Sequence, residues 1–134
     1  MPFLFHSPVV HFPVALWLTS ALFDLLHLWT GDGFHSRVAQ LLIGLGLLGA
    51  MAAVITGFVD YRPLVAEGIG QTFINLHRRH SLFAYASTVV YLVSFLVRWR
   101  RLTIGRGGTA VLMAAGAVLI GLAGYFGGEV RGAM

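Results

Sequence analysis

Histidines and arginines supply most of the side chains in this chain that could bind a metal ion or an anion. The sequence has six histidines, and all nine of its basic residues are arginine. It has no cysteine, which excludes disulfides, thiolate ligands and iron–sulfur ligation. Four histidines, His6, His11, His77 and His80, fall close to the starts of two apolar runs. Because imidazole is a good ligand for iron, copper and zinc, any metal chemistry is expected at these histidines.

Four apolar runs must position these side chains. They cover Val9–Trp29, Val38–Val59, His80–Trp99 and Gly108–Phe126, with connections at Thr30–Arg37, Asp60–Arg79 and Arg100–Gly107. About 20 helical residues span the hydrocarbon core of a bilayer, roughly 30 Å. Only 10% of the residues are charged and 57% are hydrophobic, whereas a soluble domain carries about 25% charged residues. The sequence predicts an all-α integral membrane protein, with residues 1–134 as one four-helix, up-down-up-down domain.

The arginines lie in short stretches between the apolar runs, as membrane-interface charges do. This placement argues against a nucleic-acid partner, because no single exposed face gathers them. One face holds Arg37 and the cluster from Arg98 to Arg106, and the other holds fewer arginines. The positive-inside rule then predicts a multi-pass protein of the bacterial inner membrane with both termini periplasmic. The segment Met1–Ser7 contains no basic residue, so no cleavable signal is predicted, and we find no convincing internal repeat.

Two histidines are expected at matching depth, His11 on the first span and His80 on the third. Alternate helices of a four-helix bundle face each other across its core, so this pair could ligate a b-type haem (iron) from both sides. Arg78 and Arg79 directly precede His80 and are predicted to pair with the haem propionates. His77 and His6 are predicted to substitute for these ligands or to bind a second haem.

Other interpretations of the same residues remain open. The histidines could lie among the lipid headgroups without any site. A zinc or copper site could use His6, His11, His77 and His80, although no carboxylate stands at close ligand spacing. Asp24 lies inside the first span, three residues before His27, and either forms a structural hydrogen bond or belongs to a proton path. The glycines and alanines of the second and fourth spans favour close helix packing or leave room for the edge of a flat cofactor.

One family resemblance covers nearly the whole chain. The segment from His6 to Pro13, His-Ser-Pro-Val-Val-His-Phe-Pro, resembles the His-Pro-x-x-Val-His-Phe-Pro signature of a family of small four-span bacterial membrane proteins of unknown function. Gly57 to Asp60, the histidine at the start of the third span and Gly127-Gly128 extend the likeness. Ser7 departs from the proline that the family carries directly after its first histidine. Some members resemble redox modules fused to, or encoded near, Rieske-type electron-transfer proteins, which implies haem or electron transfer here.

These observations predict a membrane-bound b-type haem protein or electron-transfer subunit with bis-histidine ligation near one membrane surface. It would act with a redox partner or within a larger membrane complex rather than as a stand-alone enzyme. The alternative is a non-enzymatic structural or assembly subunit that packs through its small-residue faces. A small transporter that uses Asp24 is a weaker option, because no helix is interrupted at the midplane.

Overall fold

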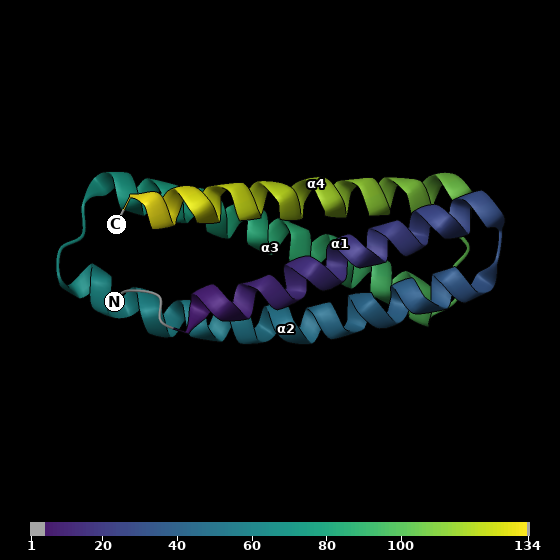
Figure 1. The fold of residues 1–134 in the computed structure, drawn as a ribbon, viewed down its shortest axis with the longest axis horizontal. Helices are drawn as coiled ribbons and strands as arrows, with labels where there is room; N and C mark the ends of the chain where they lie inside the picture. The colour runs from purple at the N-terminus through teal and green to yellow at the C-terminus, as the bar shows by residue number, and fades with distance from the viewer. Residues whose placement is uncertain (1–4, 134) are drawn as a thin grey trace.

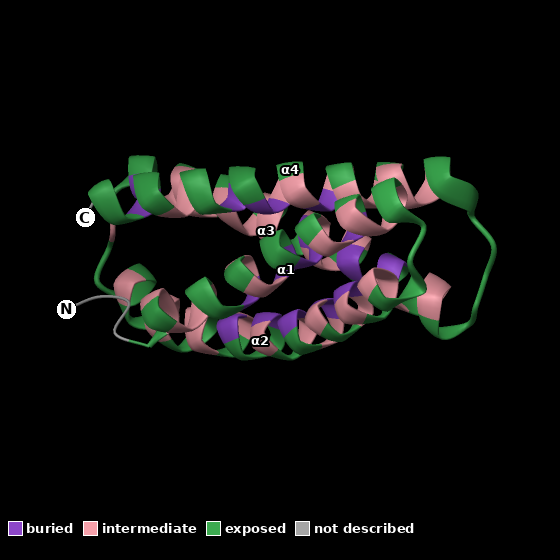
Figure 2. Ribbon diagram, turned by 45° about the vertical axis from the view of Figure 1, so that its right-hand side comes forward, coloured by how far each residue is buried: buried purple, intermediate pink, exposed green. Residues whose placement is uncertain are grey.

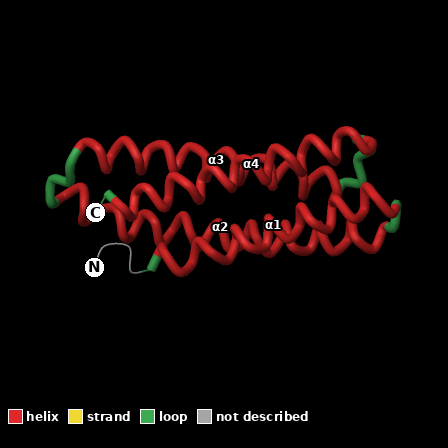
Figure 3. The backbone as a smooth tube through the Cα atoms, turned by 45° about the horizontal axis from the view of Figure 1, so that its top comes forward, coloured by secondary structure: helices red, strands yellow, loops and turns green. Residues whose placement is uncertain are grey.

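A computed structural model describes residues 5–133 as four consecutive α-helices in a bundle. The helices are α1 (His6–Thr30), α2 (Gly33–Ala66), α3 (Gln71–Trp99) and α4 (Gly105–Gly132), shown in Figure 1. Each is long and apolar enough to cross a membrane, and successive helices run in opposite directions between short connections (Figure 3). The predicted four-helix membrane bundle is confirmed. Residues 1–4, most of the segment on which the absence of a signal is predicted, lie outside the described residues.

The helices extend beyond the apolar runs, and the connection predicted at Asp60–Arg79 is too long. In the structure α2 ends at Ala66 and α3 begins at Gln71. Gly68, with φ of 76°, provides the left-handed residue that reverses the chain between them. The polar sequence around Asp60 and His77 is therefore helical, because a helix that leaves the hydrocarbon core no longer needs an apolar surface. His80 consequently lies in the third turn of α3 rather than at its start.

Two helical hairpins form the bundle. α1 packs most extensively on α2, and α3 packs most extensively on α4. Buried residues lie along the sides of the helices that face the middle of the bundle (Figure 2). Large apolar side chains cover the outside, among them Leu41, Leu48, Leu82 and Val111. Such an exterior matches a lipid environment, in which helices satisfy their backbone hydrogen bonds internally.

An approximate two-fold relation links the hairpins, although the sequence itself shows no convincing internal repeat. Trp17 of α1 stacks on Tyr91 of α3, 74 residues later, with ring centroids 4.2 Å apart and planes 15° apart. Asp24 and Arg98 are also 74 residues apart and form an ion pair of 2.7 Å. The buried Ser20 and Ser94 have the same spacing. Few side chains are identical between the halves, which is why the repeat is visible in the contacts and not in the sequence.

Glycine lets the central aromatic rings lie directly on the neighbouring helix. A Cβ atom on Gly46 of α2 would overlap the Trp17 indole, and one on Gly116 of α4 would lie 2.8 Å from the Tyr91 ring. These glycines are 70 residues apart, rather than the 74 that separate equivalent residues of α1 and α3. The two-fold relation therefore also links α2 with α4, at a spacing four residues shorter. Close packing is therefore the role of some of the glycines in α2 and α4.

Asp24 binds an arginine rather than the neighbouring His27. Its side chain is 3% exposed, and its Oδ2 atom accepts a hydrogen bond from Arg98 on α3. Asp24 Oδ1 has no hydrogen-bond partner among the described residues. The Nδ1 atom of His27 instead donates to the Asp32 carbonyl, 2.8 Å away, at the α1–α2 turn. The ion pair supports the structural interpretation of Asp24.

Removal of either partner should leave an uncompensated buried charge. We expect Asp24→Ala or Arg98→Ala to destabilise the bundle by about 3–5 kcal/mol. The exchanged variant Asp24→Arg/Arg98→Asp should recover most of this loss, because the two positions face each other across the two-fold axis. Thermal unfolding in detergent measures both effects, with Arg100→Ala as the exposed-arginine control. A double variant no more stable than the single ones would contradict the two-fold relation.

Candidate functional site

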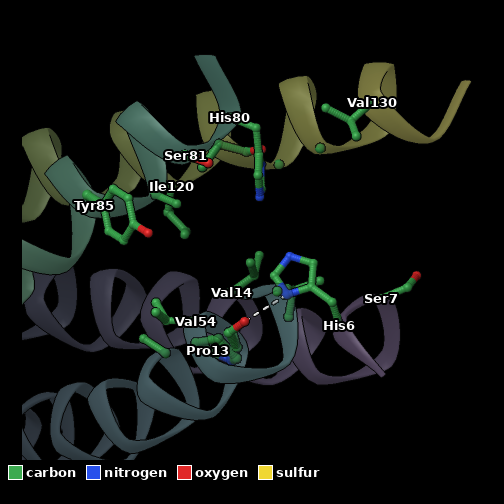
Figure 4. Close-up of a pocket in the computed structure, with 18 of the residues that line it drawn as sticks. His6, Ser7, Pro13, Val14, Val54, His80, Ser81, Tyr85, Ile120 and Val130 are labelled. Atoms are coloured by element: carbon green, nitrogen blue, oxygen red, sulfur yellow. Dashed lines mark hydrogen bonds between the residues drawn. The ribbon is translucent and has the colours of Figure 1, made fainter. Parts of the chain in front are cut away.

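A cavity of about 480 Å³ opens between the two hairpins at the end of the bundle where α1 begins and α4 ends (Figure 4). All four helices line it. The Trp17 side chain closes the cavity toward the middle of the bundle, together with Pro13 and Ile120. Its volume lies in the range of about 300–1,000 Å³ that is typical of sites for small molecules and cofactors.

His6 and His80 face each other across this cavity. Their ring centroids are 6.0 Å apart and the ring planes are 82° apart. Figure 4 shows the two imidazoles pointing toward one another, one from each hairpin. Two imidazoles on opposite sides of one metal ion, with metal–nitrogen bonds of about 2.0–2.1 Å, have centroids roughly 6 Å apart. The spacing therefore suits two ligands of a single metal.

Each imidazole is oriented by a backbone carbonyl of the neighbouring helix. His6 Nδ1 lies 2.8 Å from the Ala53 carbonyl oxygen, and His80 Nδ1 lies 2.8 Å from the Ala123 carbonyl oxygen. A carbonyl only accepts, so Nδ1 is the donor in both rings, and in the neutral form Nε2 carries the lone pair. Metal-binding histidines usually have this second interaction, which fixes both tautomer and ring orientation.

A glycine on the neighbouring helix makes room for each imidazole. A Cβ atom on Gly57 would lie 3.1 Å from His6 Nδ1, and one on Gly127 would lie 3.2 Å from His80 Nδ1. Each glycine is four residues after the alanine whose carbonyl accepts the hydrogen bond. The unit of histidine, carbonyl and glycine thus occurs once in each hairpin. Gly57, Gly124, Gly127 and Gly128 all line the cavity, so these glycines of α2 and α4 border open space rather than only a packed helix.

Asp60 fixes the first turn of α1, which carries His6. Its Oδ2 atom accepts hydrogen bonds from the backbone N–H groups of Phe5 (3.0 Å) and His6 (2.8 Å). No side chain of α1 itself caps this terminus. An acidic group from α2 thus satisfies N–H groups at the positive end of the helix. The segment from Gly57 to Asp60 therefore contacts His6 twice: Gly57 lies beside the imidazole, and Asp60 binds the backbone N–H group.

The other predicted site residues lie around this pair. The His77 ring stacks on Tyr61 of α2, with centroids 4.0 Å apart, and its centroid is 6.3 Å from that of His80. His11 lines the cavity but is exposed, and the two-fold relation matches it with Tyr85 of α3. His6, rather than His11, is therefore the histidine opposite His80. The sequence signal that could have shown this is the dipeptide His-Ser near the starts of the first and third spans, at residues 6 and 80. The same dipeptide also occurs at residue 35, so the signal is not specific.

The arginines predicted for the site lie outside the cavity lining. Arg78 is exposed, and the Arg79 guanidinium lies over the Phe126 ring, 6.0 Å from its centroid. Arg131 near the end of α4 is the arginine that lines the cavity, and no candidate set from the sequence singles it out. The α4 helix continues past its apolar run to Gly132, which brings Arg131 to the cavity about one turn beyond Gly127.

The alternative of four histidines around one zinc or copper ion finds no support within residues 5–133. No group of three or more histidine, cysteine, aspartate or glutamate side chains is arranged to hold a metal ion there. Zinc sites in proteins usually have three or four protein ligands. A pair of opposed imidazoles instead suits a metal ion whose remaining ligands come with it.

The glycines beside the histidines provide a test of this arrangement. A methyl group at Gly57 or Gly127 should displace the adjacent imidazole by a few tenths of an ångström and weaken its hydrogen bond. We expect Gly57→Ala and Gly127→Ala each to cost about 1–3 kcal/mol of stability by overpacking. Thermal unfolding in detergent is the measurement. Gly121→Ala is the control, since a Cβ atom there meets nothing within 4 Å, and an equal loss in the control would refute the assignment.

Comparison with known proteins gives a family but no relative of known function. No match to the chain is found among curated proteins or among solved structures. A family model described as a predicted membrane protein (DUF2231) matches residues 3–132, which include all four helices and the four histidines that line the cavity. The chain therefore belongs to the DUF2231 family of predicted membrane proteins.

Proposed function

We propose that this protein is a membrane-bound b-type haem protein that transfers electrons, with His6 and His80 as the two axial ligands. The observation that carries the proposal is the opposed pair of imidazoles, whose ring centroids are 6.0 Å apart, at a cavity of about 480 Å³. Relative to the sequence-based prediction, His80 is retained and His6 takes the place of His11. A bound haem would supply a one-electron iron couple at this end of the membrane.

The donor set fits a haem better than a bare ion. Two histidines complete the coordination of an iron whose other four ligands come from a macrocycle. The Ala53 and Ala123 carbonyls hold both rings in the tautomer that offers Nε2. Gly57 and Gly127 leave space at the rings, and apolar side chains such as Val14 and Ile120 would exclude water. The chain's own role is thus to orient two imidazoles in an apolar space.

Polar side chains at the mouth of the cavity would interact with the edge of the cofactor. Arg131, which lines the cavity, would pair with a propionate, a role that the sequence suggested for Arg78 and Arg79. The stacked pair of Tyr61 and His77 borders the same opening. Exposed arginine and histidine side chains here would also meet a redox partner protein or a larger membrane complex.

We further propose the bacterial inner membrane as the location, with the histidine end on the periplasmic side. The α1–α2 and α3–α4 connections lie at the other end, where the cluster of arginines is found. Positively charged short loops favour the cytoplasmic side. Electron exchange at the cavity would then take place near the periplasmic surface.

An absorption spectrum of the protein purified after expression with adequate haem tests the proposal. We expect a Soret band and the spectrum of a bis-histidine, low-spin haem. His6→Ala and His80→Ala should each abolish the bis-histidine spectrum, because each removes one axial ligand. His11→Ala is the matched control and should retain it.

The outcomes separate the cofactor from the choice of ligands. If the wild-type protein shows no Soret band, the haem proposal is wrong. If His11→Ala loses the bis-histidine spectrum while His6→Ala keeps it, the haem is retained but His11 is the ligand, as the sequence suggested. Circular dichroism of each variant shows whether a lost spectrum reflects lost folding.

The alternative function is a structural or assembly subunit, and one observation favours it. The outward face of α4 exposes Ala114 and Gly121, and a Cβ atom on Gly121 would meet nothing in the described part of the chain. Small residues of this kind permit close contact with a helix of another protein. A stable complex that tolerates loss of every histidine but not of Gly121 would favour this function.

A further inference from the structure

A second cavity, of about 440 Å³, lies at the opposite end of the bundle. Parts of all four helices and the α3–α4 connection surround it. Its lining combines apolar side chains, such as Leu28, Val97 and Ile104, with polar and basic ones. No aspartate or glutamate is among the described residues that form it. The polar lining includes Ser36, Gln40, Arg98, Arg101, Thr103 and Arg106.

The arginines give this cavity a net positive charge. Asp24, next to the cavity, offsets the charge of Arg98, which also donates to the Ser36 carbonyl at 3.3 Å. Arg101 and Arg106 are exposed and have no such carboxylate in the cavity wall. Arg106 donates to the Leu28 carbonyl at the end of α1, which fixes its guanidinium at the rim. A guanidinium has five N–H donors, so this contact leaves capacity for an anion.

The level of the cavity in the membrane indicates which kind of ligand it would meet. Trp29 at the end of α1 and Trp99 at the end of α3 are exposed at the same end of the bundle, 83% and 65% respectively. Exposed tryptophans mark the level of the lipid headgroups, where phosphate groups are abundant. Basic pockets between helices at this level bind the phosphates of anionic lipids.

We propose that this cavity binds a phosphoryl anion through Arg101 and Arg106, supplied by the headgroup of an anionic phospholipid. The hydroxyl and amide groups of Ser36, Gln40 and Thr103 would accompany the arginines as hydrogen-bond donors. Arg98 is held by Asp24 and Ser36 and forms the fixed part of the site. The proposal does not depend on the haem.

Native mass spectrometry and thermal unfolding of the purified full chain test it. In detergent, added phosphatidylglycerol should be retained and should raise the melting temperature, whereas phosphatidylcholine should do neither. Arg101→Gln/Arg106→Gln should weaken retention by about 30-fold, because each arginine contributes to anionic-lipid binding. The control Arg37→Gln/Arg100→Gln removes two exposed arginines of the same end that do not line the cavity, and it should retain the lipid.

A further arm with inorganic phosphate distinguishes the source of the anion. If phosphate stabilises the wild type but not Arg101→Gln/Arg106→Gln, the site also accepts soluble phosphoanions, and the phosphoryl chemistry stands. Equal retention of both lipids by the wild type, with no effect of phosphate, would overturn the proposal. An equal loss in the control pair would overturn it too, since binding would then reflect general surface charge. Circular dichroism confirms that both double variants keep their helices.

Discussion

The rest of this structure depends on the stack of Trp17 on Tyr91 at the centre of the bundle. Two large rings occupy the middle of the core, and they fit only because Gly46 and Gly116 let each ring lie against a helix backbone. In lipid, where apolar surfaces gain little by leaving the solvent, such close packing is a main source of helix association. The stack holds the hairpins together at one level, and the remaining contacts on the axis are placed above and below it: the histidine pair toward one end and the ion pair toward the other.

The two kinds of helix contribute different groups to the site. α1 and α3 carry the polar and aromatic side chains of the axis, while α2 and α4 supply glycines, alanines and carbonyl oxygens. Ser20 of α1 and Ser87 of α3 bond within their own helices, to the Trp17 carbonyl at 2.7 Å and the Ala84 carbonyl at 2.9 Å. The histidines of the cavity differ, because His6 and His80 donate to the neighbouring helix. Side chains that bond across helices are held by two elements at once, which is the condition for a ligand that must keep its orientation.

Hydropathy alone predicted the four helices, since a bilayer demands long apolar helices and little else satisfies their backbone. The site was only partly predictable. The place of His80 in the cavity and the gathering of histidines at one end followed from their positions along the spans. The pairing with His6 did not, because the rotation of α1 about its own axis depends on Trp17 packing against Gly46, a contact between residues far apart in the chain. Arg131 was missed because a hydropathy pattern does not show how far a helix continues into water. The partner of Asp24 was missed for a related reason: Arg98 looked like an interfacial charge.

The ion pair on the two-fold axis has a consequence for how the protein is encoded. In a symmetric dimer of two identical hairpins, a residue on the axis meets its own copy, so an aspartate would face an aspartate and the charges would repel. Asp24 faces Arg98 only because one polypeptide contains both hairpins and each can hold a different residue at the equivalent place. In a single chain, unlike in a homodimer, the residues that meet at the axis therefore need not be identical. The same freedom allows the two ends of the axis, and the two faces of any ligand bound there, to become unlike.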